Sequence, residues 1–309
     1  DEKFGYYMKK NPFGKDGDYI TSPLISNLFG EMIAIWCVAF WEHLEKPRKI
    51  LIAELGPGDA SLCKILINTF KNFKDFYKCV EIKLIEKSKN LKKIQKEKIK
   101  NSKIKWIKKI NELNEGPIIF LCNEFFDSLP IKQVYIKKNI FLEKHITLSK
   151  NSNKIKFEFK KAQKNLISSI KKHNLINEGN VIEYPNTAIG YLKKISEKIN
   201  NYNGALLSFD YGYIAKKNRD TLQSISKHKY ANILTKPGDS DITHHINYNL
   251  FNSILKKNKL EVNKIVSQGE FLQRLGIIER ANVVSKNKSF KMKADLFYRL
   301  KKLIDNKEM

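Results

Sequence analysis

The sequence has few cysteines and lacks any closely spaced pair of them. The four cysteines are Cys37, Cys63, Cys79 and Cys122, and no C-x-x-C motif occurs. Three of them lie inside apolar segments, where a thiol behaves as a small hydrophobic side chain. The pattern argues against a disulfide framework and against a zinc site, so we expect a reducing compartment and no metal ion.

A long apolar run is also absent. The longest one, residues 32–40, is well short of the roughly 20 residues that cross a bilayer. No charged and then apolar signal peptide opens the sequence, and we expect no membrane span. With 309 residues and a hydrophobic content of 42%, the chain can bury a substantial core, and the run at residues 32–40 predicts a buried helix.

Acidic residues and arginine are scarce compared with lysine. Lysine and arginine together number 58 against 32 acids, which gives a net charge of +26. Nearly all of the excess is lysine, spread beside abundant asparagine and isoleucine as an AT-rich coding sequence would produce. Arginine is the better reader of bases and phosphates. Charge alone permits non-specific binding, and we therefore expect no nucleic-acid partner on this ground.

Several catalytic motifs are missing. The sequence has neither the G-x-S-x-G elbow of serine hydrolases nor the G-x-x-x-x-G-K-[ST] loop that binds nucleotide phosphates. Residues 237–245 are dense in acids and histidines, but the adjacent His244 and His245 cannot point the same way from a strand or a helix. We expect a substrate-contacting or structural loop there rather than a metal site.

Strand-like and helix-like segments alternate through most of the chain. Helical spacing is found at residues 60–70 and in a lysine-rich stretch that ends near residue 100. Short apolar runs typical of buried parallel strands occupy residues 49–55, 80–85, 104–107, 117–122 and 205–209. The alternation predicts a doubly wound α/β sheet, whose ligands bind at the carboxyl ends of the strands.

About 80 residues separate the last two of these strands, too many for a simple crossover. Several β-like runs lie between residues 131 and 159, and they predict an inserted β-rich subdomain. We expect an N-terminal segment (1–48), a core (49–130 and 180–309) and an inserted substrate-recognition region (131–179). The expected elements after the insert are helices at residues 188–199 and 248–256, a strand at 261–266 and a final basic helix.

A glycine-rich turn follows the first predicted strand. Gly56 and Gly58 lack Cβ, so the backbone can turn sharply and approach a ligand, although any strand-to-helix turn can require glycine. Dinucleotide-binding turns have a third glycine, but Ser61 stands at that position and Asp59 would repel a pyrophosphate. The turn favours a cofactor without phosphates, such as S-adenosylmethionine, whose cationic end suits the carboxylates of Glu54 and Asp59.

Acidic residues also follow two other predicted strands. Glu86 closes the second strand and is placed to accept hydrogen bonds from two ribose hydroxyls. Asn123, Glu124 and Asp127 follow the fourth, where two carboxylates in a short loop would be costly to bury without a role. They could orient a cationic acceptor for in-line methyl transfer. The alternative is that these acids are solvated or belong to an ordinary turn before Pro130.

Segments along nearly the whole chain resemble the MidA-like methyltransferases, a family that includes mitochondrial complex I assembly factors that methylate a protein arginine. They include ELGPGDASL, NEFFDSLP and KPGDSDITHHINY. In order, they occupy residues 5–36, 54–62, 123–130, 209–213, 220–230, 236–248 and 268–277.

The resemblance implies a class I methyltransferase fold, with a Rossmann-like sheet that carries the inserted subdomain, and S-adenosylmethionine as the cofactor. The cofactor contacts that it implies are Glu54, Gly56, Gly58, Glu86, Thr21, Ser22 and Asn123. The catalytic residues that it implies are Asn123, Glu124 and Asp127, and those for substrate binding are Asp210, Tyr211, His228 and His244.

The acceptor that the resemblance implies is an arginine of a protein, such as a core subunit of the complex I quinone module. The compartment would be the mitochondrial matrix in a eukaryote and the cytoplasm in a bacterium. Two alternatives stay open. One is methylation of RNA or a small molecule, which the basic surface favours, and the other is a non-catalytic assembly chaperone.

Overall fold

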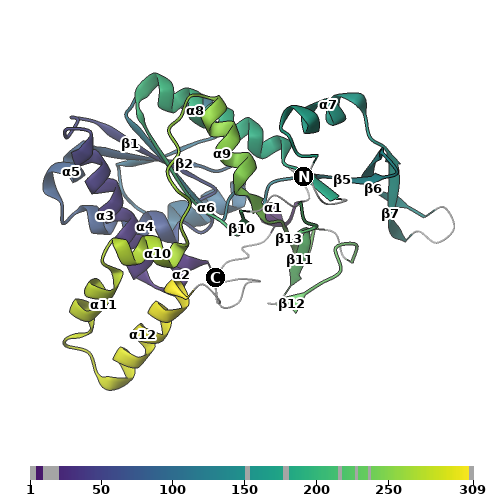
Figure 1. Ribbon diagram of the computed structural model, residues 1–309. Helices are drawn as coiled ribbons and strands as arrows, with labels where there is room; N and C mark the ends of the chain where they lie inside the picture. Colours follow the sequence, from purple (N-terminus) through teal and green to yellow (C-terminus); the bar gives the residue numbers. More distant parts are fainter. Residues whose placement is uncertain are drawn as a thin grey trace. The chain divides into compact units, whose positions relative to one another are not determined.

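The computed structural model of the chain describes residues 5–9, 21–149, 154–176, 181–214, 218–226, 229–235 and 238–305 (Figure 1). The chain forms two compact units. The first unit comprises Asp1–Glu124, Lys198–Phe209 and Asn263–Met309, and the second comprises Phe125–Glu197 and Asp210–Val262. The second unit contains all of the predicted insert, residues 131–179, together with sequence on both sides of it.

The first unit is built on a five-stranded sheet in which every neighbouring pair is parallel. In spatial order the strands are β3 (Ile104–Ile107), β2 (Val80–Ile85), β1 (Ile50–Leu55), β4 (Ile118–Asn123) and β9 (Gly204–Phe209). The five predicted strands are confirmed, each with ends that differ by at most one residue. All residues of β1 are buried, as expected for a central strand covered on both faces.

The strand order reverses direction between β1 and β4. From β1 the chain builds outwards through β2 and β3, and then places β4 on the opposite side of β1. Such a reversal is the point at which open α/β sheets bind ligands, at the carboxyl ends of the two strands. The sequence-predicted doubly wound fold is therefore present in the first unit.

Helices cover this sheet. Those of the first unit are α1 (Tyr6–Lys9), α2 (Ser22–Ile25), α3 (Asn27–His43), α4 (Ser61–Phe70), α5 (Lys74–Cys79), α6 (Lys89–Lys98), the 3₁₀ turn η1 (Ile110–Glu112), α10 (Gln268–Arg274), α11 (Ile277–Ser285) and α12 (Phe290–Ile304). The predicted buried helix at residues 32–40 is confirmed within α3. No helix in the described ranges is both long and apolar enough to cross a membrane.

The core of the first unit depends on close packing of α3 against α4 and the sheet. A Cβ on Gly30 would lie 2.7 Å from Cγ2 of Ile65, so the two helices approach too closely for a larger residue there. Phe29 of α3 meets Phe209 at the end of β9 edge to face, with ring centroids 5.2 Å apart. This face of the sheet is the one to which Ile50 and Ile52 contribute buried side chains.

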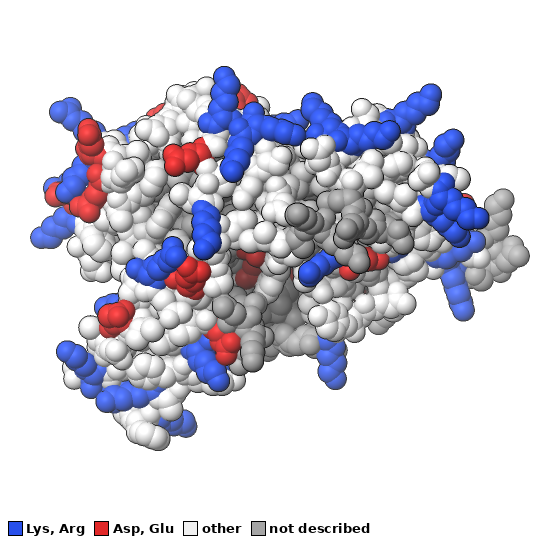
Figure 2. All heavy atoms as spheres, viewed as in Figure 1, with Lys and Arg blue, Asp and Glu red and all other residues white. Residues whose placement is uncertain are grey.

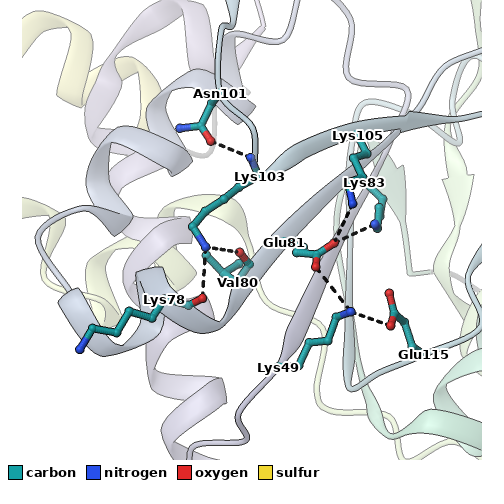
Figure 3. Close-up of polar contacts among 9 residues, drawn as sticks. All are labelled: Lys49, Lys78, Val80, Glu81, Lys83, Asn101, Lys103, Lys105 and Glu115. Atoms are coloured by element: carbon teal, nitrogen blue, oxygen red, sulfur yellow. Dashed lines mark hydrogen bonds and ion pairs between the residues drawn. The ribbon is translucent and has the colours of Figure 1, made fainter.

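Lysines in the amino-terminal half of the sheet are held by acids. Glu81 of β2 lies 2.9 Å from the amino group of Lys83, 3.4 Å from Lys49 and 3.9 Å from Lys105 (Figure 3). Lys49 also pairs with Glu115 at 2.6 Å. The hydrogen bond from Lys83 is the main reason that the pKa of Glu81 lies below its ordinary value. Part of the lysine excess is therefore structural.

The second unit contains the predicted β-rich insert. Its antiparallel sheet has the strand order β7 (Ile155–Lys161), β6 (Ile140–Leu148), β5 (Lys132–Lys137) and β8 (Val181–Tyr184). Its helices are α7 (Lys164–Lys172), most of α8 (Asn186–Tyr202) and α9 (Tyr248–Lys257), and its short strands are β10 (Gly212–Tyr213), β11 (Gln223–Ser226), β12 (Lys229–Tyr230), β13 (Asp241–Thr243) and β14 (Ile246–Asn247). The predicted helices at residues 188–199 and 248–256 are confirmed.

The expected strand at residues 261–266 is wrong. These residues form neither helix nor strand, and the chain passes from the second unit to the first within them. Their alternating pattern lacks a neighbouring strand among the described residues, and without one an extended segment has no ladder of hydrogen bonds. The final basic helix, in contrast, is present as α12.

Candidate functional site

Glu54 carries a buried carboxyl group at the end of β1. The residue is 3% exposed, and its Oε2 has no hydrogen-bond partner among the described residues. Burial raises its pKa from an ordinary value of 4.5 to about 8, and the nearby charge of Asp59 adds to the shift. A buried carboxyl oxygen without a donor is costly, and a cationic ligand would remove that cost.

The glycine turn after β1 has the backbone shape that only glycine adopts without strain. Gly56 and Gly58 have positive φ angles of 61° and 56°. The N–H of Gly56 donates to the carbonyl of Ile85 at 3.3 Å, which ties the turn to the end of β2. Ala60 at the N-cap of α4 is also left-handed, with φ of 61°. The chain therefore turns tightly from strand to helix.

Strand register places three predicted cofactor residues in one row. Leu55, the last residue of β1, pairs with Ile85 of β2 and with Cys122 of β4. The residues that follow these three are Gly56, Glu86 and Asn123. Because parallel strands advance together, the three lie at the same edge of the sheet. The structure thus brings together residues that are 67 positions apart in sequence, the difference between 56 and 123.

Glu86 already accepts two hydrogen bonds. Its Oε1 accepts from the N–H of Ser88 at 2.7 Å, and its Oε2 accepts from Nε2 of Gln95 at 3.0 Å. Burial is the main cause that raises the pKa of this carboxyl, while hydrogen bonds, including those from Ser88 and Gln95, oppose the shift. A carboxylate has about four lone-pair positions, so Glu86 retains acceptor capacity for ribose hydroxyls.

Gln95 of α6 is a residue that sequence reasoning missed. Its side chain is fully buried, and its Nε2 donates to the carbonyl of Gly58 at 2.8 Å as well as to Glu86. Its Oε1 accepts from the indole N–H of Trp106 at 2.9 Å. Gln95 therefore connects the glycine turn, the end of β2 and a side chain of β3. A glutamine within a lysine-rich helix gives no sequence signal of this role.

Asp59 already has partners within the protein. Its Oδ2 lies 2.6 Å from the amino group of Lys98, and its two oxygens also accept from the hydroxyl and the N–H of Ser61. The ion pair offsets the negative charge, so Asp59 repels a phosphate less than expected. The missing third glycine is then the stronger indication against a pyrophosphate.

Asn123 and Glu124 end β4 in an unusual conformation. Glu124 has a positive φ of 48°, and its N–H donates to the carbonyl of Phe209 at 2.8 Å. The Oδ1 of Asn123 is buried without a hydrogen-bond partner in the described ranges. Positive φ at a residue with a long side chain costs about 1–3 kcal/mol and is found preferentially at functional sites. Both residues belong to the first unit.

The second unit brings together three of the other predicted site residues. Asp210 accepts through Oδ2 from the N–H of Phe126 at 2.9 Å, and Asp127 accepts through its carbonyl from the N–H of His244 at 3.1 Å. Asp127 and His244 are buried, and burial lowers the pKa of His244. Tyr211, next to Asp210, is 39% exposed.

Aromatic packing holds the loop that carries Asp127. Phe126 is fully buried and meets Phe251 of α9 edge to face, with centroids 5.1 Å apart. Phe125 packs on Tyr191 of α8, also at 5.1 Å. Phe126 is thus a core residue, and Phe125 is half-buried. They fix the backbone on which the acids of the loop lie.

Thr21 and Ser22 lie at the start of α2, and both are buried. The hydroxyl of Ser22 donates to Oε1 of Gln268 at 3.0 Å, so it has a structural partner within the first unit. His228 lies outside the described residues. In the part of the chain that the structure describes, no group of three or more His, Cys, Asp or Glu side chains could hold a metal ion.

A doubly wound sheet with a glycine turn and polar side chains at its switch point is typical of Rossmann-like enzymes that bind nucleoside cofactors. Residues 32–266 match the family described as "putative S-adenosyl-L-methionine-dependent methyltransferase", and the chain belongs to this family. It is a methyltransferase that uses S-adenosylmethionine.

The chain is similar to several named sequences. It is 29% identical over 305 residues to the mitochondrial protein arginine methyltransferase NDUFAF7 of Xenopus laevis, covering 91% of this chain and 69% of the relative. Identity to the human protein of that name is 26%, with 91% and 68% covered. A crystal structure from Burkholderia thailandensis with S-adenosyl-homocysteine bound is similar over 100% of this chain and 82% of that chain. The TM-score is 0.84 and the sequence identity is 18%, so the two proteins share a fold.

The residues of the first unit fit S-adenosylmethionine. The unpartnered oxygen of Glu54 suits its ammonium group, the remaining lone pairs of Glu86 suit its ribose hydroxyls, and the turn at Gly56 leaves backbone accessible to a ligand. The assignment of individual contacts remains a prediction.

We expect Gln95→Met to weaken cofactor binding. The change removes three hydrogen bonds at similar side-chain volume. Those to Gly58 and Glu86 support the cofactor residues, and at about 1 kcal/mol each we expect a loss of about 30-fold in affinity in calorimetric titration. Lys93→Met, on the exposed side of the same helix, is the control. The indole N–H signal of Trp106 should also shift in Gln95→Met. Unaltered affinity in a folded Gln95→Met protein would contradict this positioning role.

We expect Glu54→Gln to affect the stability of the cofactor-free protein and the binding of S-adenosylmethionine in opposite directions at high pH. Because the pKa of Glu54 is raised on folding, the folded protein holds this proton more tightly than the unfolded chain. The protein without cofactor should therefore lose stability, relative to Glu54→Gln, as pH rises from about 4.5 towards 8. Thermal melts at about pH 5 and about pH 9 measure this difference. The variant should nevertheless bind S-adenosylmethionine more weakly, and a gap in stability that is independent of pH would count against a buried neutral carboxyl.

Proposed function

We propose that this methyltransferase transfers the methyl group of S-adenosylmethionine to an arginine side chain of a protein acceptor. The observation that carries the proposal is Glu124, a carboxylate held with positive φ at the carboxyl end of β4. A guanidinium stays protonated in water and pairs well with carboxylates, so an acceptor arginine needs an acid of this kind.

The relatives support the same acceptor class. Those from Xenopus and human are named protein arginine methyltransferases, at 29% and 26% identity over most of this chain. By this similarity the acceptor is a protein, and the candidate that we put first is a core subunit of the complex I quinone module. We propose the mitochondrial matrix as the compartment in a eukaryote, because the relatives are named mitochondrial, and the cytoplasm in a bacterium.

The chemistry places modest demands on the residues. Bound S-adenosylmethionine supplies an electrophilic methyl group, and its transfer forms a carbon–nitrogen bond as the carbon–sulfur bond breaks, with one proton released from the guanidinium. Glu124 would orient the guanidinium and offset its charge, and Asn123 would donate or accept a hydrogen bond beside it. Alignment of the reacting atoms accounts for most of the rate of such a displacement.

Asp127, Asp210, Tyr211 and His244 are proposed acceptor contacts in the second unit. Asp127 and His244 are buried beside one another, and the Nε2 of His244 has no hydrogen-bond partner in the described ranges. The pKa of His244 is lowered by burial, so its ring is neutral near pH 7 and can accept a hydrogen bond from an arginine. His228 is proposed for the same group by resemblance alone.

We expect Glu124→Gln to retain the cofactor and lose transfer. The amide preserves the size of the side chain but removes the charge that pairs with a guanidinium, and losses of about 100-fold or more in rate are typical for such a group. The measurement is transfer of labelled methyl from S-adenosylmethionine to purified core subunits of the complex I quinone module, with the modified residue found by mass spectrometry. Glu97→Gln, an exposed acid on α6, is the matched control.

Three results would redirect the assignment. Labelling of RNA or of small molecules, with none in the protein subunits, would overturn a protein acceptor. Full transfer by Glu124→Gln would remove the proposed role of Glu124. Tight binding of a subunit that is never methylated, and is unaffected by Glu124→Gln, would support an assembly chaperone instead.

A further inference from the structure

The last two helices of the first unit form an arm. α11 and α12 pack on each other and are joined by residues 286–289, and Figure 1 shows the joined end projecting at the lower left. Near the base, Ile277 of α11 and Leu303 of α12 are buried. Apolar side chains are exposed near the joined end, and Phe297 and Tyr298 farther along α12 are also 38% and 60% exposed.

The exposed apolar side chains at the joined end are large. Phe290, the first residue of α12, is 88% exposed, and Val283 and Met292 are 56% and 52% exposed. The N-cap hydroxyl of Ser289 accepts from the N–H of Met292, so this end of α12 is a properly capped helix. A phenylalanine left almost wholly in water gives no stability to the fold, and clustered exposed apolar groups mark interaction sites.

Lysines lie near these three side chains in the sequence. They are Lys286, Lys288, Lys291 and Lys293, and no aspartate or glutamate occurs from residue 280 to residue 294. Figure 2 shows lysine and arginine side chains bordering the projecting end. We call Val283, Phe290, Met292 and the four lysines the arm tip. Arg280, nearer the base, is paired with Glu31 at 2.7 Å and is not part of it.

The charge and the apolar side chains of the arm tip indicate which kind of partner it binds. A second copy of the chain would bring like charges together, because the protein carries a net charge of +26. A stable protein interface buries about 800 Å² on each partner, which three apolar side chains at the end of a projecting arm do not offer. An anionic membrane surface suits both features, since apolar side chains enter the headgroup boundary while lysines contact phosphates.

We propose that the arm tip is a peripheral membrane-binding surface that takes anionic phospholipid. Phe290 and Met292 enter the headgroup region, and the four lysines meet the lipid phosphates. The proposal concerns the arm alone and does not depend on the identity of the methyl acceptor.

The test is co-sedimentation of the whole purified protein with vesicles. One set contains phosphatidylcholine only, and the other contains phosphatidylcholine with about one third phosphatidylglycerol. Binding to the anionic set alone is expected. Replacing the four lysines of the arm tip by glutamine should weaken it by about 600-fold, at roughly fivefold for each lysine. Phe290→Ser combined with Met292→Ser should weaken it by about tenfold.

Two matched controls separate the arm tip from general charge and general hydrophobicity. Lys89, Lys92, Lys93 and Lys100, around α6, changed to glutamine remove the same charge from another face. Ile146→Ser with Leu148→Ser removes apolar side chains of β6 that are 61% and 64% exposed. Both controls should bind within about threefold of the natural protein. All variants should keep their thermal stability and their affinity for S-adenosylmethionine.

Equal losses in the two fourfold lysine variants would overturn the proposal, because binding would then follow net charge. A serine variant of the arm tip that binds as well as the natural protein would overturn the entry of Phe290 and Met292. Absence of vesicle binding by the natural protein would also overturn it and would leave an acidic protein as the partner of the arm tip.

Discussion

The pairing of β1 with β2 on one side and β4 on the other is the constraint on which the candidate cofactor site depends. Leu55 is matched to both Ile85 and Cys122, and a shift of either register by one residue would move Glu86 or Asn123 out of the row with Gly56. It would also turn apolar side chains of the buried strands to the wrong face. The hydrophobic core thus fixes the position of the polar groups.

The acidic side chains near this row are either paired with neighbouring groups or kept protonated. Lys98 offsets Asp59, Gln95 and Ser88 satisfy Glu86, and burial keeps Glu54 protonated at neutral pH. Because the pKa of Glu54 is about 8, a ligand with an ammonium group would cause this carboxyl to lose its proton at little cost in free energy. The site of the first unit is therefore prepared for a cation at one end and for hydroxyl groups at the other, which is the chemistry of S-adenosylmethionine.

The sequence predicted the elements with strong local signals and missed those that depend on the rest of the fold. The parallel strands could be predicted because short continuous apolar runs are typical of strands buried on both faces. The glycine turn could be predicted because Gly56 and Gly58 adopt positive φ angles, which favour glycine. The alternating residues 261–266 predicted a strand that no neighbour completes. The role of Gln95 and the pairing of Asp59 with Lys98 could not be read in advance, because each depends on how α6 packs against residues 37 and 39 positions earlier in the sequence.

The claim that the row at the carboxyl edge binds S-adenosylmethionine is tested most directly by calorimetric titration of the purified protein with S-adenosylmethionine, S-adenosylhomocysteine and NAD, repeated on Gly58→Val. Gly58 has a φ of 56°, where valine is strained. Binding of the two sulfur compounds and not of NAD, with loss of binding in a variant that remains folded, is the expected result. Undiminished binding of S-adenosylmethionine by folded Gly58→Val, or binding of NAD in its place, would contradict it.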